Sequence, residues 1–370
     1  MNLALNLPLN KVSFGQVSTL LLRTIYDQEA NGAKTHNLFL FPIGQIDLSS
    51  QSQDEKFMEW IKSKIINGIE NYSRDIPCFK LWHLNGSLES VSSKPSLLTF
   101  YELDEPTKVE LNIARNTNLI FSSKYSCEVF EKAGIKSSYL PLGFDSYNFK
   151  VLNKKAHDDD RIVFNLCGKL EKRKHHEKII KAWIKKFGSN NQYALQCAVF
   201  NPFFGRNQEE INANNQQAIG KILGGVKPFN VSFFPMMTEN VVYNEFLNSS
   251  DIILGLSGSE GFGLPEFQSI ALGKHAVLLK AHAYKDWATD EMVTWVNQTG
   301  KIPAYDNVFF QKGQPFNQGN IFDFNEDEFI ASCEIAIQKV KASRVNNAGL
   351  TLQNTFSKEK FVEGVINVLQ

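Results

Sequence analysis

The sequence predicts an α/β protein built from two doubly wound domains joined by a linker. Short apolar runs of strand length alternate with amphipathic stretches of helix length, and this alternation starts twice along the chain. A polar, charge-dense stretch without periodicity, residues 150–161, separates the two series. The length of 370 residues is enough for two domains. Because strands separated by helices pair through right-handed crossovers, each series predicts a parallel sheet.

The first series predicts one domain over residues 1–148, followed by a linker over 149–160. Its expected strands are 37–41, 78–84, 96–102, 118–123 and 137–143, and its expected helices lie near 14–30, 54–72 and 123–134. The last helix ends in "EKAGIK", where Gly134 acts as a helix stop.

The second series predicts a domain over residues 161–345. Its expected strands are 161–168, 193–200, 231–236, 251–257 and 275–280, and its expected helices lie near 175–188, 206–223, 239–249 and 264–273. Further helices are expected near 325–342 and 357–370, the latter within a closing segment over 346–370.

The composition is that of a globular protein and excludes several functional classes. Hydrophobic residues make up 43% of the chain, and 39 basic residues balance 39 acidic ones, so bulk charge favours neither nucleic-acid nor membrane binding. Five scattered cysteines without a CxxC or Cys/His cluster indicate no metal site and favour a reducing compartment. Without a signal-peptide pattern or a run of membrane-helix length, we expect a cytoplasmic protein with no stable membrane insertion.

The most informative stretch is "SGSEGFGLPEFQSIALGKHAVLL", which begins at Ser257. It follows the buried-strand run "DIILGLS" and predicts a glycine-rich turn that leads into a helix, with Pro265 in the first helical turn. Gly261 and Gly263 allow the backbone to approach a ligand closely, and the helix start favours an anion. Glu260, at the end of the strand, can accept hydrogen bonds from sugar hydroxyls. The same residues also fit a tight strand-to-helix turn with an incidental acid.

A second informative stretch is "NLCGKLEKRKHHEKIIKAWIKKF", which carries a local excess of six positive charges. Lys169 follows a strand at a glycine turn and Lys174 precedes a helix, so both are candidates to contact phosphate groups. The later lysines are expected on a solvated helix face, opposite apolar residues that recur at helical spacing and face the sheet. The expected solvated set is Lys178, Lys181, Lys185 and Lys186, and the expected buried set is Ile180, Trp183, Ile184 and Phe187.

Three residues of the first series are candidates for an interdomain cleft. Gly15 lies between a polar loop and a helix that starts near Gln16, where it either caps the helix or forms a phosphate or acceptor loop. His83 in "LWHLNGS" and Glu102 in "LTFYELDEP" each end a predicted strand. Either side chain points into the cleft or is a satisfied polar residue at a strand end.

Taken together, these segments resemble the GT-B fold retaining glycosyltransferases of the large family four group. The hallmark of that family is a Glu-x7-Glu element written roughly "EGFGLP..EA.A.G.PV", and this chain has "EGFGLPEFQSIALGKHAV". The segment "CGKLEKRKHHEKIIKAW" is similar to the family's Gly-Arg/Lys turn followed by a lysine. The runs "NLIFSSKYSCEVFEKAGIKSSYLPLGFDSYNF" and "TENVVYNEFLNSSDIILGLS" match the segments before the linker and before the hallmark. Finally, "TFSKEKFVEGVINVL" is similar to the C-terminal helix that crosses back to the first domain.

The resemblance implies two Rossmann-like domains that face each other across a cleft, the first for the acceptor and the second for a nucleotide sugar. By position, Glu260 would bind hydroxyls of the donor sugar. Lys169 and Lys174 would neutralise the diphosphate leaving group, with Gly15 as a loop glycine beside it. The backbone amides that would bind the sugar and the diphosphate belong to Gly261, Phe262, Gly263 and Leu264.

One position departs from the family pattern. The second glutamate of the hallmark, which binds the ribose in the family, is Gln268 here. An amide can still hydrogen-bond a ribose diol, although less strongly than a carboxylate. We expect Gln268 to point toward the nucleotide from the second turn of its helix, and Glu266, two residues earlier, to face elsewhere.

The function implied by the resemblance is transfer of a hexosyl or pentosyl group from a nucleotide-diphosphate sugar, with a UDP-sugar favoured, without a cofactor or metal. The chain also resembles glycosyltransferases of large DNA bacteriophages, some of which decorate hydroxymethylated bases. That resemblance implies a host cytoplasm and leaves two acceptors open, modified DNA or a glycan. A non-catalytic nucleotide- or glycan-binding protein, and an epimerase or phosphorylase of the same fold, remain alternatives.

Overall fold

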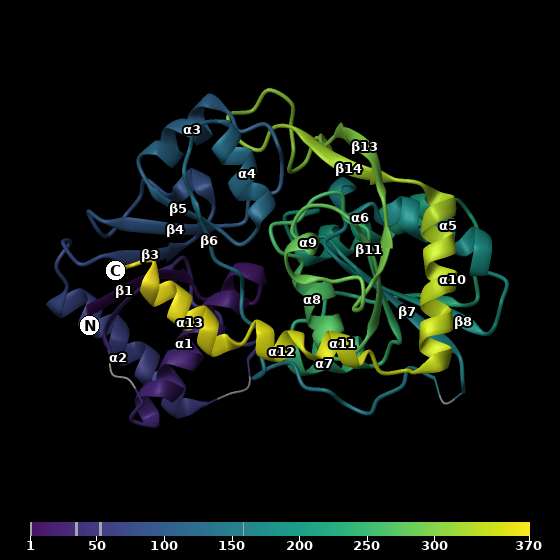
Figure 1. The fold of residues 1–370 in the computed structure, drawn as a ribbon, viewed down its shortest axis with the longest axis horizontal. Coiled ribbons are helices and arrows are strands. Elements are labelled where there is room, and N and C mark those ends of the chain that lie inside the picture. The colour runs from purple at the N-terminus through teal and green to yellow at the C-terminus, as the bar shows by residue number, and fades with distance from the viewer. Residues whose placement is uncertain (1, 34–35, 52–53, 158) are drawn as a thin grey trace.

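The computed structural model describes residues 2–33, 36–51, 54–157 and 159–370, which form two α/β domains side by side (Figure 1). The sheet of the first domain has the strand order β2-β1-β3-β4-β5-β6, and every neighbouring pair is parallel. Its strands are β1 (Asn2–Pro8), β2 (Asn37–Ile43), β3 (Cys78–Leu81), β4 (Pro95–Thr99), β5 (Asn118–Phe121) and β6 (Ser138–Tyr139). Its helices are α1 (Ser13–Ala30), α2 (Glu55–Asn71), η1 (Leu84–Gly86), α3 (Lys108–Arg115) and α4 (Lys124–Lys132).

The sheet of the second domain has the order β12-β11-β10-β7-β8-β9 and is also parallel throughout. Its strands are β7 (Ile162–Gly168), β8 (Tyr193–Val199), β9 (Val231–Phe233), β10 (Ile252–Gly255), β11 (His275–Leu279) and β12 (Thr294–Val296). Its helical segments are η2 (Lys172–Lys174), α5 (His176–Phe187), α6 (Gln208–Leu223), α7 (Asn240–Asn248), α8 (Leu264–Ala271), α9 (Tyr284–Trp287) and α10 (Glu326–Ala342). The predicted pair of doubly wound α/β sheets is therefore confirmed.

Several elements differ from the sequence expectation. Strand β1 was not expected, because polar Asn6 and terminal Pro8 interrupt its apolar pattern, yet it is buried between β2 and β3. The amide of Asn6 donates to Phe41 O at 2.8 Å, so the polar group is satisfied inside the sheet. Helix α3 and strand β12 were also not expected, and the strand predicted over 137–143 contains only the two residues of β6.

An antiparallel hairpin of β13 (Gln298–Pro303) and β14 (Asn320–Phe324) reaches from the second domain to the first, at the top of Figure 1. The Thr107 hydroxyl, just before α3, donates to Pro315 O at 2.6 Å. The backbone amide of Asn317 donates to Glu110 Oε1 at 2.9 Å. The hairpin therefore packs on the beginning of α3, and no pattern in the sequence predicted it.

Helix α5 lies against the second sheet with its apolar side inward. Trp183 and Ile180 are fully buried, and Phe187 is 3% exposed, as predicted. Lys181 and its later lysine neighbours are exposed, but Lys178 is not solvated as expected. Its ammonium contacts Asp323 Oδ1 at 2.7 Å, because β14 covers this end of the helix.

The chain crosses between the domains twice. The linker after Phe149 is held by asparagines of α7: Asn244 Oδ1 accepts from Lys150 N at 3.1 Å and Asn248 Oδ1 from Leu152 N at 2.8 Å. After α10, the chain passes through α11 (Asn347–Leu350) and α12 (Leu352–Thr355) to α13 (Lys358–Asn367), which packs on α1 (Figure 1). The two crossings touch, because Phe144 N donates to Phe356 O at 2.7 Å.

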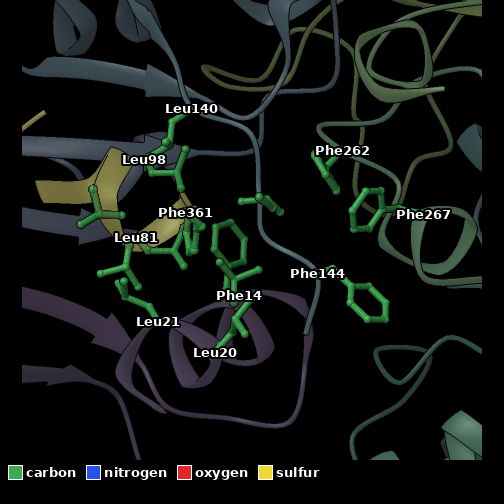
Figure 2. Close-up of a cluster of buried hydrophobic side chains, with 14 of the residues drawn as sticks. Phe14, Leu20, Leu21, Leu81, Leu98, Leu140, Phe144, Phe262, Phe267 and Phe361 are labelled. Atoms are coloured by element: carbon green, nitrogen blue, oxygen red, sulfur yellow. The ribbon is translucent and has the colours of Figure 1, made fainter. Parts of the chain in front are cut away.

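One hydrophobic core runs through both crossings. Figure 2 shows Phe14 and Phe361 among the leucines of the first domain, and Phe144 below Phe267 of α8 on the right. The rings of Phe144 and Phe267 lie 6.4 Å apart, and those of Phe267 and Phe262 lie 5.0 Å apart. The core therefore extends from the first sheet to the glycine-rich turn before α8. None of the helices in the described ranges is both long and apolar enough to cross a membrane.

Replacing Phe361 by Ala should destabilise the docking of α13. Its side chain is 2% exposed, so the truncation leaves a cavity that typically costs about 3–5 kcal/mol. Glu363→Ala, on the exposed side of the same helix, is the matched control. Thermal unfolding of the two variants measures the effect, and an equal melting temperature for both would show that α13 contributes no packing.

Candidate active site

The candidate site lies where the strand order of the second sheet reverses, between β7 and β10. In doubly wound sheets this position opens a crevice at the carboxyl ends of the strands, where ligands bind. Strand β7 ends at Gly168 and is followed by Lys169, and β10 ends at Gly255, shortly before Glu260. The two stretches that the sequence analysis singled out therefore meet at one edge of the sheet.

The turn after β7 places Lys174 directly over the end of that strand. Gly168 has a φ of 125°, a conformation that favours glycine. A methyl group at Gly168 would lie 3.2 Å from Cε of Lys174, so the lysine packs on the bare backbone. Lys174 closes the short helix η2, and the left-handed His175, with a φ of 54°, leads into α5.

The turn after β10 approaches the first domain closely and leaves a helix start without a side-chain cap. A methyl group at Gly261 would lie 2.7 Å from Cβ of Phe100, so only glycine fits against the first domain here. Gly263, with a φ of 87°, precedes α8, which has no side-chain hydrogen bond at its N-cap. Backbone amides in the first turn, from Leu264 on, are the groups that bind anions at helix starts.

Glu260 is buried against two cations. Its side chain contacts Lys174 Nζ, and its Oε1 lies 3.0 Å from Nη1 of Arg173. Burial would raise the pKa of Glu260, but Arg173 and Lys174 outweigh that effect and hold the pKa well below its usual range. Glu260 is therefore ionised at neutral pH and acts only as a hydrogen-bond acceptor.

Arg173 is a site residue that the sequence analysis missed. It is 5% exposed, and besides Glu260 it contacts Glu171 Oε1 at 2.5 Å and Glu102 Oε1 of the first domain at 3.1 Å. Residue type does not distinguish Arg173 from the other basic residues of the stretch, and two of its partners, Glu102 and Glu260, come from other segments. The one available signal is the Glu-x-Arg spacing with Glu171, which is itself buried.

Lys169 lies at the accessible side of the cluster. Its Nζ is 3.2 Å from Glu171 Oε2 and 3.9 Å above the ring of Phe309, and about a third of its side chain is exposed. Lys169 and Lys174 are thus both brought to the end of β7, one exposed and one buried.

Glu266 was expected to face away from the candidate site, and this expectation is wrong. It is 1% exposed, and its Cγ lies 2.5 Å from the position that a methyl group at Gly255 would occupy. Its side chain therefore lies over the end of β10, beneath the glycine-rich turn. Burial raises the pKa of Glu266 to about 7, with Lys174 opposing the shift and Glu260 adding to it. Gln268 is also buried, with 6% of its surface exposed.

The three first-domain candidates lie in different surroundings. Glu102 reaches the cluster, since its carboxylate contacts Arg173 and its backbone carbonyl accepts from Ser259 Oγ. His83 is exposed and packs edge-on against Phe14, with ring centroids 4.7 Å apart. Gly15 lies in the first turn of α1 and not in a loop.

The position of Gly15 has a steric cause. A methyl group there would lie 1.8 Å from Asn10 O, so close packing alone requires glycine. Its role beside a diphosphate stays a prediction.

Comparison with known proteins identifies the class of fold. No protein-family model and no curated protein matches the chain. Sucrose-phosphate synthase from Thermosynechococcus elongatus aligns over 98% of this chain and 96% of its own length, with 13% identity and a TM-score of 0.60. A glycosyltransferase from Rickettsia africae ESF-5 aligns over 100% and 97%, with 11% identity and a TM-score of 0.64.

A third solved structure, described as trehalose-6-phosphate from E. coli bound with UDP-2-fluoro glucose, aligns over 100% of this chain and 99% of its own length. Its identity is 9% and its TM-score 0.62. At these identities the likeness is one of fold. The chain has the GT-B fold found in glycosyltransferases, with two Rossmann-like domains.

Replacing Glu266 by Gln should change how stability depends on pH. The folded-state pKa of about 7 lies above the ordinary 4.5, so the folded protein holds this proton more tightly than the unfolded chain. Its burial therefore destabilises the protein increasingly as pH rises through that window, by up to about 3 kcal/mol. Glu266→Gln should raise the melting temperature relative to the parent at about pH 8 and much less at about pH 5.

Glu291→Gln serves as the control, because Glu291 is exposed. Melting curves of the three proteins across this pH range decide the matter. A difference between Glu266→Gln and the parent that stays constant with pH would contradict the assigned pKa shift.

Proposed function

We propose that this protein is a glycosyltransferase that moves a sugar from a nucleotide-diphosphate donor to an acceptor hydroxyl. The observation that carries this proposal is the contact between Lys174 and Glu260 at the point where the strand order reverses. Lys174 suits a diphosphate and Glu260 suits sugar hydroxyls. A nucleotide sugar presents these two chemistries on either side of a single bond, the one that the reaction breaks.

The fold supports the same substrate class. GT-B structures align with this chain over nearly its whole length, and one of them is described as bound with UDP-2-fluoro glucose. We therefore propose a UDP-sugar as the donor, with a hexosyl or pentosyl group as the sugar transferred.

The proposed chemistry needs charge stabilisation more than acid–base catalysis. The bond between the anomeric carbon and the diphosphate oxygen breaks, a bond from that carbon to the acceptor oxygen forms, and the proton of the acceptor hydroxyl passes to the departing diphosphate. Positive charge builds on the sugar and negative charge on the departing diphosphate. Lys169, Lys174 and the amides at the start of α8 stabilise that negative charge from fixed positions. We further propose that the reaction retains the anomeric configuration and needs no metal.

Glu260 orients the donor sugar in this scheme. Because Arg173 and Lys174 keep it ionised, both carboxylate oxygens accept hydrogen bonds and neither donates one. The same two cations fix its orientation, so the sugar meets a preorganised group. The acceptor approaches from the first domain, where His83 is a candidate contact.

The acceptor is proposed only as a hydroxyl, on a glycan or on a hydroxymethylated base of DNA. The cationic stretch around Lys169 and α5 would favour a phosphate backbone, whereas the overall charge balance favours a neutral glycan. One observation favours a second function. Gln268 occupies the position of the second glutamate in the glycosyltransferase family that the sequence resembles. Loss of that carboxylate would fit a protein that binds a nucleotide or glycan but no longer catalyses transfer.

Release of nucleoside diphosphate from a panel of nucleotide sugars tests the proposal. The assay is run without acceptor, with glycans and with hydroxymethylated DNA, and Glu260→Ala is the matched inactive variant. Release by the parent that Glu260→Ala abolishes, while circular dichroism shows that the variant is folded at the assay temperature, supports transfer. Donor binding without release under every condition would instead support the non-catalytic function.

Lys169→Ala and Lys174→Ala should each lower the rate of transfer at least about a hundredfold, equivalent to about 2.7 kcal/mol of barrier. Both lysines follow β7, where the diphosphate is proposed to lie. Lys181→Ala is the control, since this lysine of α5 is half exposed and, within the described ranges, forms its ion pair with Glu177 of the same helix. Steady-state kinetics with melting temperatures check the effect, and a loss below about threefold at both sites would refute the leaving-group assignment.

Substitutions of Gln268 test its proposed contact with the ribose. Gln268→Glu should preserve activity and change the donor KM by about tenfold or less, because either side chain can bond a diol. Gln268→Leu should raise the donor KM further, since the ribose hydroxyls would face an apolar group. Donor KM values of the three proteins are compared, and equal tolerance of Leu and Glu would mean that Gln268 does not touch the ribose.

A further inference from the structure

The segment 100–105, which follows β4, makes a row of contacts with the second domain. Phe100 packs against Gly261, and the backbone carbonyl of Glu102 accepts a hydrogen bond from Ser259 Oγ. Two carboxylates of the segment then meet cations of the second domain. Glu102 Oε1 lies 3.1 Å from Nη2 of Arg173, and Asp104 Oδ2 lies 2.6 Å from Nζ of Lys301.

Of the two cations, only Arg173 also contacts Glu260, the carboxylate proposed to bind the sugar. The guanidinium of Arg173 contacts Glu102 through Nη2 and Glu260 through Nη1, the latter at 3.0 Å. A guanidinium is planar and rigid, so its two nitrogens cannot move independently. The first domain and Glu260 therefore hold opposite ends of one rigid group. Lys301, by contrast, lies on β13 and has no contact with Glu260 among the described residues.

Arg173 is otherwise held by its own domain. Glu171 Oε1 is 2.5 Å from its Nη2, and the backbone carbonyl of Ser259 accepts from its Nη1. These contacts keep the side chain buried wherever the first domain lies. Among the described contacts of Arg173, that with Glu102 is the one that depends on the two domains being together.

We propose that Glu102 is a positioning residue that acts through Arg173 to set the orientation of Glu260 once the first domain lies against the donor site. This inference rests on the proposed glycosyltransferase function and identifies how the acceptor domain takes part in it. Donor binding to the second domain does not need the contact. The group transfer, which requires both domains together, does need it.

Glu102→Gln tests the proposal, with Asp104→Asn as its matched control. Each variant neutralises one carboxylate of the same segment, and each removes one ion pair with the second domain, but only Glu102 connects to Glu260. Glu102→Gln should lower the kcat of transfer at least about tenfold, while Asp104→Asn should change it less than about threefold. The Kd of the nucleoside diphosphate released from the active donor, measured by calorimetry, should stay within about threefold of the parent in both.

A second variant separates positioning from general damage. Arg173→Lys keeps the charge but cannot hold two carboxylates on one planar group. It should lower kcat about as much as Glu102→Gln does. The kcat of the double variant should be little lower than that of either single variant, because both substitutions disrupt the same contacts from Glu102 through Arg173 to Glu260.

The outcomes distinguish this inference from the proposed function. An unchanged kcat in Glu102→Gln, an equal loss in Asp104→Asn, or additive losses in the double variant would each overturn the inference while leaving transfer intact. If the parent protein releases no nucleoside diphosphate from any donor, the proposed function itself fails.

Discussion

A carboxylate buried between two cations is the interaction on which the rest of the site depends. Glu260 is removed from water at the domain boundary, and an isolated charge there would be costly. Arg173 and Lys174 supply the compensation, and removing one partner of such a buried group typically costs about 3–5 kcal/mol. The chain must therefore deliver two consecutive basic residues and one acid to the same point from strands that are far apart in sequence.

The local backbone follows from that requirement. Gly168 has no side chain, so Lys174 lies over the end of β7. Gly261 allows the turn that carries Glu260 to press against Phe100 of the first domain. Gly258 donates its amide to Arg173 O at 2.8 Å, which joins the two turns through their backbones. These glycines thus allow the segments that carry Lys174, Arg173 and Glu260 to pack closely, in addition to any approach of a ligand.

The sequence was a good guide to the fold and to those site residues that follow strands. Apolar alternation located ten of the strands of the two large sheets, whereas β1 was hidden by Asn6, a polar residue satisfied inside the sheet. The hairpin of β13 and β14 could not be foreseen, because contacts with the first domain hold it in place. Helix α3 did carry a readable signal, the capping box of Thr107 and Glu110.

The prediction of the site failed where an orientation depends on packing. Glu260 and Lys174 could be located because both positions are determined by strand ends. The orientation of Glu266 was predicted wrongly, since the rotation of α8 is determined by its packing on β10 and not by counting from Glu260. Arg173 could not be recognised, because its three carboxylate partners come together only in the folded chain.

The paired chain crossings have a mechanical consequence. The linker and the C-terminal return pass between the domains side by side, joined by the hydrogen bond from Phe144 to Phe356, so both covalent tethers lie along one edge (Figure 1). Two bodies tethered along one edge separate most readily by turning about that edge. The hairpin of β13 and β14 bridges the domains on the other side of the molecule, at the top of Figure 1, and therefore lies away from that edge. A small rotation would break its ion pair between Lys301 and Asp104 before it separated the phenylalanines near the axis.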